Sequence, residues 1–183
     1  KAVGEKRTAL VQAFAEARAY GTAERAQRIP VPDLKLAAMQ PWLDRKATVF
    51  LHADDVVSIS DALDFAEREN LQAAIVGGHE AWRVADRLRR MNVPVILTGT
   101  HRLPRRRYDA LDASYTAAVK LAEAGVPFAL ATLGDSFDTT NLRNLPYQAA
   151  TAVAFGLSRE QALKAMTLYP AQILGVAEHY GSL

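Results

Sequence analysis

The feature that most constrains the fold is an alternation of short apolar runs with longer segments of helical pattern. Four apolar runs lie within residues 48–55, 73–80, 93–99 and 128–136. Strands that alternate with helices predict a parallel sheet with right-handed crossovers. We therefore predict an α/β fold with about four parallel strands, flanking helices and an all-helical C-terminal tail. Such units make up half of a TIM-like (β/α)₈ barrel or most of a small doubly wound sheet, and no Gly-x-Gly-x-x-Gly turn favours nucleotide binding.

The chain of 183 residues is long enough for one domain of ordinary size. We predict a single domain over residues 1–183, with leading helices in 1–45, βα units in 46–135 and a helical tail in 136–183. Within the first part, apolar residues recur at helical spacing over residues 6–27.

Polar side chains mark several expected helix starts. Asp33 has the position of an N-cap for a short helix. Ser58 or Ser60 is expected to begin the helix after the first strand. Ser158 and Gln161 have the spacing of a capping box.

Composition excludes several function classes. The formal net charge is only +2, and the basic run at residues 105–107 has the pattern of a solvated loop, so we expect no nucleic-acid partner. No apolar run reaches the length of about 18 residues that a membrane span needs. Cysteine is absent, which leaves His, Asp and Glu as the strong metal ligands. These properties predict a soluble protein, cytoplasmic or periplasmic, with a small-molecule substrate.

Two strand ends carry the strongest candidates for a catalytic site. His52 and Asp135 each follow an apolar run, and the carboxyl ends of parallel strands lie on one rim. At such a rim His52 is a candidate zinc ligand, or alternatively a histidine bonded to a backbone carbonyl. Asp135 is a candidate metal ligand and general base, or alternatively a turn aspartate that caps the next segment.

Weaker candidates lie nearby in the sequence. His79 follows two glycines and is either a metal ligand or the start of a helix. His101 and Arg102 lie in a long loop and are candidates for contacts with an anionic substrate group, although a surface role for His101 is the simpler interpretation. Of the neighbouring Asp54 and Asp55, one is expected to cap the following turn, and either is a candidate to orient His52.

The last part of the chain resembles the end of the amidohydrolase barrel, as found in imidazolonepropionase-like members. The resemblance rests on a combination of short motifs: Gly156-Leu157, Glu160-x-Ala162-Leu163, Ala165-x-Thr167, Pro170-Ala171 and Leu174-Gly175. An apolar strand and Gly134-Asp135-Ser136 precede them at the distance expected for the last barrel strand of that superfamily.

The resemblance implies a role for the candidate residues. His52 corresponds to the histidine that ends the fifth barrel strand, and Asp135 to the aspartate of the eighth. In such enzymes these residues bind one or two divalent metal ions, usually zinc, together with a His-x-His pair from the first strand, and the aspartate helps to activate water. The chain contains no His-x-His pair, and His79 lies a residue or two away from the sixth-strand position.

We therefore expect the chain to be a fragment of a metal-dependent enzyme that hydrolyses C–N bonds in an amide or cyclic amide. The alternative is a catalytically silent member or fragment that binds a ligand or partner. The isolated chain is expected to be inactive, because half of the ligand set is missing. A homo-oligomer would cover the barrel edges that a half barrel leaves exposed.

Overall fold

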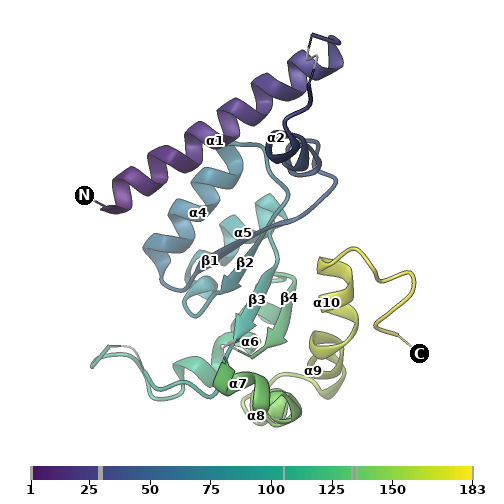
Figure 1. Ribbon diagram of the computed structural model, residues 1–183. Helices are drawn as coiled ribbons and strands as arrows, with labels where there is room; N and C mark the ends of the chain where they lie inside the picture. The colour runs from purple at the N-terminus through teal and green to yellow at the C-terminus, as the bar shows by residue number, and fades with distance from the viewer. Residues whose placement is uncertain (1, 29–30, 105, 133, 135, 183) are drawn as a thin grey trace. The chain divides into compact units, whose positions relative to one another are not determined.

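A computed structural model of the chain describes residues 2–28, 31–104, 106–132, 134 and 136–182. The chain divides into two compact units, which are described separately (Figure 1). Unit 1 contains residues 1–49 and 66–72, and unit 2 contains residues 50–65 and 73–183.

Unit 1 is built around a long N-terminal helix. This helix, α1 (Ala2–Arg25), confirms the helix predicted near residues 6–27. It is followed by two short helices, α2 (Leu34–Ala38) and α3 (Gln40–Leu43). Asp33 caps α2 as predicted, because its Oδ1 accepts the N–H groups of Lys35 and Leu36 at 2.9 and 3.1 Å. Phe14, Ala17 and Tyr20 are the buried apolar positions of α1, whose residues 4–10 are exposed.

The sheet confirms the predicted parallel α/β architecture. Its described strands are β1 (Val49–Ala53), β2 (Ala73–Gly77), β3 (Val95–Thr98) and β4 (Phe128–Ala131), in the order β1-β2-β3-β4. The β2–β3 and β3–β4 pairs are parallel, with Ile75 opposite Val95 and Leu97 opposite Leu130. Neighbouring strands in space are therefore neighbours in sequence, which is the order of a barrel segment.

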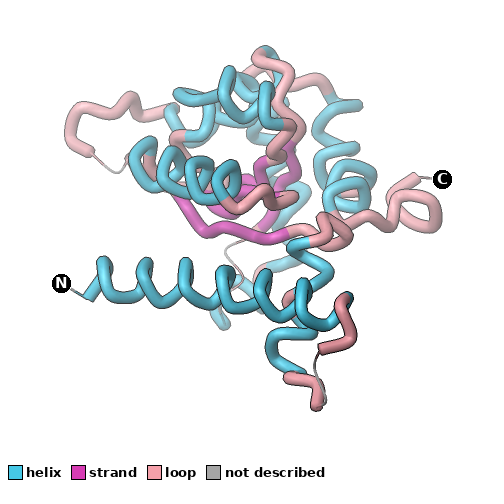
Figure 2. The backbone as a smooth tube through the Cα atoms, turned by 90° about the horizontal axis from the view of Figure 1, so that it is seen from above, coloured by secondary structure: helices cyan, strands magenta, loops and turns pink. Residues whose placement is uncertain are grey.

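Helices follow each strand of unit 2, as Figure 2 shows. They are α4 (Val56–Arg68), a 3₁₀ turn η1 (Ala81–Val84), α5 (Ala85–Met91) and α6 (Ala113–Glu123), and the last turn of α4 lies in unit 1. The segment between β2 and β3 is thus a 3₁₀ turn that continues into a short α-helix.

The helical tail also agrees with the prediction. Its elements are α7 (Ser136–Thr140), η2 (Leu142–Asn144), α8 (Leu145–Ala154), α9 (Arg159–Met166) and α10 (Leu168–Ile173). The predicted capping box at the start of α9 is present, with Gln161 N–H donating to Ser158 Oγ at 3.1 Å and Ser158 N–H donating to Gln161 Oε1 at 3.3 Å.

The two faces of the sheet belong to different clusters of buried side chains. On one face Ile75, Val95 and Leu97 form the main core with Leu63 and Leu121. On the other face Ala74 and Ala129 pack with Ile173 of α10, and Ile96 is partly buried against them. Because side chains alternate along a strand, neighbouring residues of one strand contribute to opposite faces.

Removing a buried side chain from this core should destabilise the protein strongly. Leu121 is 0% exposed, so we expect Leu121→Ala to lower the free energy of unfolding by about 2–5 kcal/mol. The matched control is Leu163→Ala, which truncates a leucine that is 59% exposed and should change stability by no more than about 0.5 kcal/mol. Thermal unfolding of both variants checks the difference, and equal losses would contradict this core.

Candidate functional site

A pocket lies where β1, β2 and β3 end. Its volume is about 390 Å³, and its lining residues are His52, Ala53, Asp54, Ser58, Val76, Gly77, Thr98 and Arg102. All of these residues belong to unit 2. The pocket therefore brings together two of the predicted site residues, His52 from β1 and Arg102 from the loop after β3.

An ion pair forms one wall of the pocket. Arg102 Nη1 donates to Asp54 Oδ2 at 3.1 Å, and Arg102 Nη2 donates to Thr98 Oγ1 at 3.4 Å. Both side chains of the pair are only partly buried. A guanidinium group has five N–H donors, so Arg102 retains donors for a ligand beyond the two used here.

Two glycines make room for this pair. Gly77 has φ +106°, and a Cβ placed there would lie 2.6 Å from Asp54 Oδ1 and 3.0 Å from Ala53 O. Gly99 has φ +67°, and a Cβ there would lie 2.9 Å from Arg102 Nε. Only glycine combines such backbone angles with such close approach at low cost. In the sequence, Gly77 is the last residue of β2 and Gly99 directly follows β3. A glycine at such a strand end is the sequence signal that could have indicated these close contacts.

The start of α4 differs from the prediction that Ser58 or Ser60 caps it. The helix begins at Val56, and Asp55 Oδ1 accepts the N–H groups of Val57 and Ser58 at 3.1 and 3.0 Å. Asp55 is therefore the capping residue, in agreement with the expectation that one of the two aspartates caps this turn. The Ser58 N–H bond is the main reason that the pKa of Asp55 is lowered.

The turn after β2 contains two buried polar residues. His79 and Glu80 are 6% and 5% exposed. Glu80 Oε1 accepts from Arg106 Nη1 at 2.5 Å, and Glu80 Oε2 accepts the Val56 N–H at 3.0 Å. His79 is absent from the described lining of the pocket, and its role as a metal ligand stays a prediction.

His101 packs against the helical tail. Its Nε2 lies 2.6 Å from Thr151 Oγ1 of α8, and its ring meets Tyr115 edge-on with centroids 6.3 Å apart. The preceding Thr100 N–H donates to Gln148 Oε1 at 3.2 Å. His101 is not among the described residues that line the pocket beside His52, whereas Arg102 is.

The described residues do not fit a metal ion by themselves. Among residues 2–28, 31–104, 106–132, 134 and 136–182, no three His, Asp or Glu side chains are grouped closely enough to hold one. His52 is exposed at the end of β1, where one coordination bond is possible. Asp135, the second predicted ligand, lies outside the described residues.

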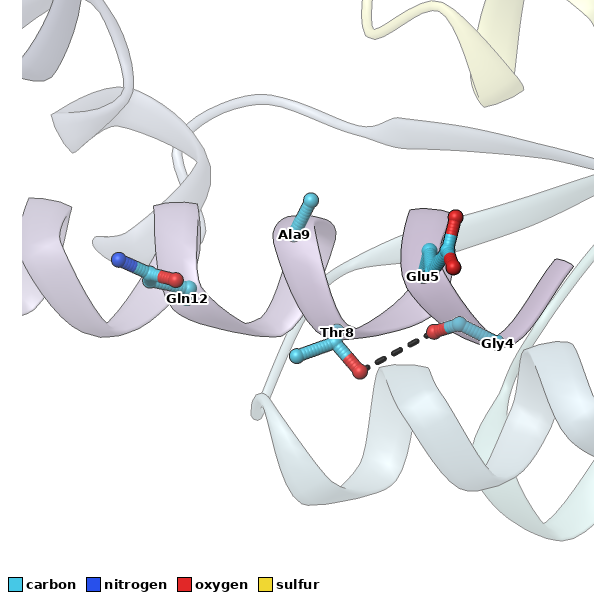
Figure 3. Close-up of a pocket in the computed structure, with 5 residues that line it drawn as sticks. All are labelled: Gly4, Glu5, Thr8, Ala9 and Gln12. Carbon is cyan, nitrogen blue, oxygen red and sulfur yellow. Dashed lines mark hydrogen bonds between the residues drawn. The ribbon is translucent and has the colours of Figure 1, made fainter. Parts of the chain in front are cut away.

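A second hollow lies along α1 and carries no comparable chemistry (Figure 3). It is lined by Gly4, Glu5, Thr8, Ala9 and Gln12, all from one exposed helix face. Thr8 Oγ1 donates to Gly4 O at 3.0 Å, which is a bond within the helix. Its lining contains one carboxylate and no histidine, so nothing converges there as it does at the strand ends.

No described helix combines the length and the apolar character needed to cross a lipid bilayer.

Comparison with solved structures gives one informative likeness. The chain is similar to the crystal structure of an amidohydrolase from Thermotoga maritima MSB8, with 28% sequence identity and a TM-score of 0.81. The match covers 96% of this chain but 46% of the other, so the chain spans about half the length of that protein. No protein-family model and no curated protein matches the chain.

This likeness agrees with the predicted fold and with the predicted resemblance to amidohydrolases. The four described strands and their helices correspond to half of an amidohydrolase barrel. The likeness therefore supports a hydrolase-like fold similar to that of an amidohydrolase.

The close approach at Gly77 generates a prediction. Gly77→Ala should destabilise the protein through its backbone angle, at a cost of about 1–3 kcal/mol, and further through the collision with Asp54. The matched control is Gly175→Ala, because Gly175 has φ +73° but no atom within 4 Å of the added Cβ. Urea unfolding should show a larger loss for Gly77→Ala, and similar losses would contradict the crowded geometry.

The Asp55 cap predicts a pH-dependent contribution to stability. Asp55→Ala should lower the free energy of unfolding near pH 7 by about 0.5–2 kcal/mol. Because the pKa of Asp55 is lowered in the folded state, this contribution is complete above the usual carboxyl range and is lost as the pH falls through the folded pKa.

Urea unfolding of wild type and variant between pH 7 and pH 2 measures the change. Asp55→Asn is the matched control, since asparagine also caps helices but does not titrate in this range. The difference between wild type and Asp55→Ala should shrink with acid, and a difference that grows with acid would contradict the cap.

Proposed function

We propose that the chain forms half of the active site of an amidohydrolase-like enzyme that hydrolyses an amide or cyclic amide C–N bond in a small molecule. The observation that carries the proposal is the pocket at the carboxyl ends of β1, β2 and β3, which contains His52, Asp54 and Arg102. In parallel α/β folds such strand ends are the usual place for catalytic groups. The likeness to an amidohydrolase structure supports the same assignment.

The proposed roles follow from the chemistry of the side chains. Asp135 acts as the general base that accepts a proton from the attacking water, which is a role suited to a carboxylate. Arg102 contacts an anionic or carbonyl group of the substrate, because its guanidinium lines the pocket and is held in place by Asp54 and Thr98. His101 is the weaker candidate for such a contact, since it is bonded to Thr151.

A divalent metal ion, zinc by the chemistry of its ligands, is proposed for a longer protein that contains this chain. His52 and Asp135 would bind it, and His79 is the weaker candidate for a third ligand. Structural and catalytic zinc sites use three or four protein ligands, so the remaining ones must come from outside this chain. The described residues alone do not form such a site, and no step of the reaction is derived through the metal.

A second candidate function is a catalytically silent scaffold that binds a ligand or partner at the same rim. The Asp54–Arg102 pair would then bind the ligand without chemistry. The sheet ends at β1 and β4, and we propose that a second copy or further chain of the same protein covers these edges in either case.

Metal content and activity together test the proposal. A longer protein that includes the first half of the barrel should bind a divalent metal and hydrolyse amides, whereas the 183-residue chain alone should not turn over. Elemental analysis should show that His52→Ala and Asp135→Asn reduce the bound metal, because each removes a ligand.

His179→Ala is the matched control for these variants, since it removes an exposed histidine near the end of the chain. Metal-dependent turnover by the 183 residues alone would overturn the proposal. A longer protein without bound metal, and with no effect of His52→Ala, would favour the silent scaffold instead.

A further inference from the structure

Three chain segments at the edge of the pocket meet at one buried carboxylate, that of Glu80. The segments are the turn between β1 and α4, the turn after β2, and the long loop between β3 and α6. Glu80 lies in the second of these and is 5% exposed. It does not line the pocket itself.

Main-chain bonds first connect the turn after β2 to the end of β1. Gly78 N–H donates to Ala53 O at 2.8 Å, and Glu80 N–H donates to Asp54 O at 2.8 Å. Ala53 and Asp54 both line the pocket and directly follow His52. The backbone of Glu80 therefore contacts the segment that carries the pocket side chains of β1.

The side chain of Glu80 extends this connection to the start of α4. Its Oε2 accepts the N–H of Val56, the first residue of the helix, at 3.0 Å. The first N–H groups of a helix have no acceptor within the helix, and the positive end of the helix dipole favours a carboxylate there. Glu80 thus supplies an acceptor that the helix lacks, from a residue 24 positions away.

The other oxygen of Glu80 holds the long loop. Arg106 Nη1 donates to Glu80 Oε1 at 2.5 Å, and the Arg106 N–H donates to Asp109 Oδ2 at 2.9 Å. Arg102 of the same loop pairs with Asp54 inside the pocket. The loop is consequently attached to the strand ends by two arginine–carboxylate pairs.

The two attachments differ in exposure. The side chain of Glu80 is 6% exposed and that of its partner Arg106 is 41% exposed, whereas those of Asp54 and Arg102 are 33% and 22% exposed. Glu80 is therefore the more deeply buried of the two carboxylates. It lies outside the pocket, where a ligand would not compete for it.

We propose that Glu80 is the positioning residue of this site: it holds the three segments in one arrangement and thereby fixes Arg102 and His52 without touching the ligand. The catalytic meaning of this role rests on the proposed function. The positional role itself does not, because it concerns only contacts within unit 2.

The variant Glu80→Gln tests the role with the smallest change of shape. Its amide oxygen still accepts one hydrogen bond, but the negative charge between Val56 N–H and Arg106 is lost. Leu103 and Tyr108 of the loop are 84% and 80% exposed and are natural sites for chymotrypsin. We expect cleavage in this loop to accelerate about tenfold in the variant, since proteolysis follows the population of the open loop.

Side-chain NMR signals of Arg102 and His52 provide the readout that general destabilisation would not reproduce. Both signals should shift in Glu80→Gln while the far-ultraviolet circular dichroism stays that of the wild type. Arg106→Gln is the second variant, and it should give the same accelerated cleavage. Combining the two should add little, because both remove the same interaction.

Glu160→Gln is the matched control. It makes the same change in an exposed pair of α9, where Lys164 Nζ lies 2.5 Å from Glu160 Oε1. It should leave the loop cleavage and both NMR signals unchanged. Unchanged cleavage and unchanged Arg102 and His52 signals in Glu80→Gln would overturn the proposal, as would fully additive effects of the Glu80 and Arg106 variants.

The result of the Glu80→Gln experiment does not depend on whether the protein hydrolyses a substrate. If Glu80→Gln behaves as expected and the longer protein lacks activity, the positional role holds and the hydrolase assignment fails. If activity is present but Glu80→Gln changes neither cleavage nor NMR signals, the hydrolase assignment holds and the role of Glu80 fails.

Discussion

The parallel hydrogen-bonded ladder from β2 to β4 is the constraint on which the candidate site depends. Its register places Ile75 opposite Val95 and Leu97 opposite Leu130, and these side chains pack against the helices. A parallel connection must return to the same end of the sheet before the next strand begins. Every turn that follows a strand therefore lies at the carboxyl end of the sheet, and residues far apart in sequence become neighbours there.

Charge pairing then determines how that edge is organised. Asp54 pairs with Arg102 and Glu80 with Arg106, so both carboxylates are matched by arginines from one loop. Glu80 is buried, and a carboxylate taken out of water requires partners, which Arg106 and the Val56 N–H supply. The partly exposed Asp54–Arg102 pair gives the loop a second attachment. The pocket histidine, His52, belongs to neither of these two pairs.

The sequence allowed the fold to be predicted well because its signals are local. The period of apolar residues located the strands and most helices, and Ser158 with Gln161 located a helix start. The start of α4 shows that local signals can compete, since the sequence offers both the serines and one of the two aspartates as caps, and Asp55 is the residue that caps the helix.

The site was less predictable because its contacts are not local. Arg102 and Asp54 are 48 residues apart, and Glu80 and Arg106 are 26 apart. No spacing rule connects such pairs; only the order of the strands does. The apolar run before it identified His52 as a candidate. The contact of His101 with α8, by contrast, depends on the packing of the helical tail.

We propose that His52 at the end of β1 is a ligand in a hydrolytic metal site. A crystal structure of a longer protein containing this chain, grown with zinc and measured at the zinc absorption edge, tests it most directly. We expect an anomalous peak about 2.0–2.1 Å from an imidazole nitrogen of His52. A well-ordered His52 side chain with no anomalous peak within bonding distance would contradict it.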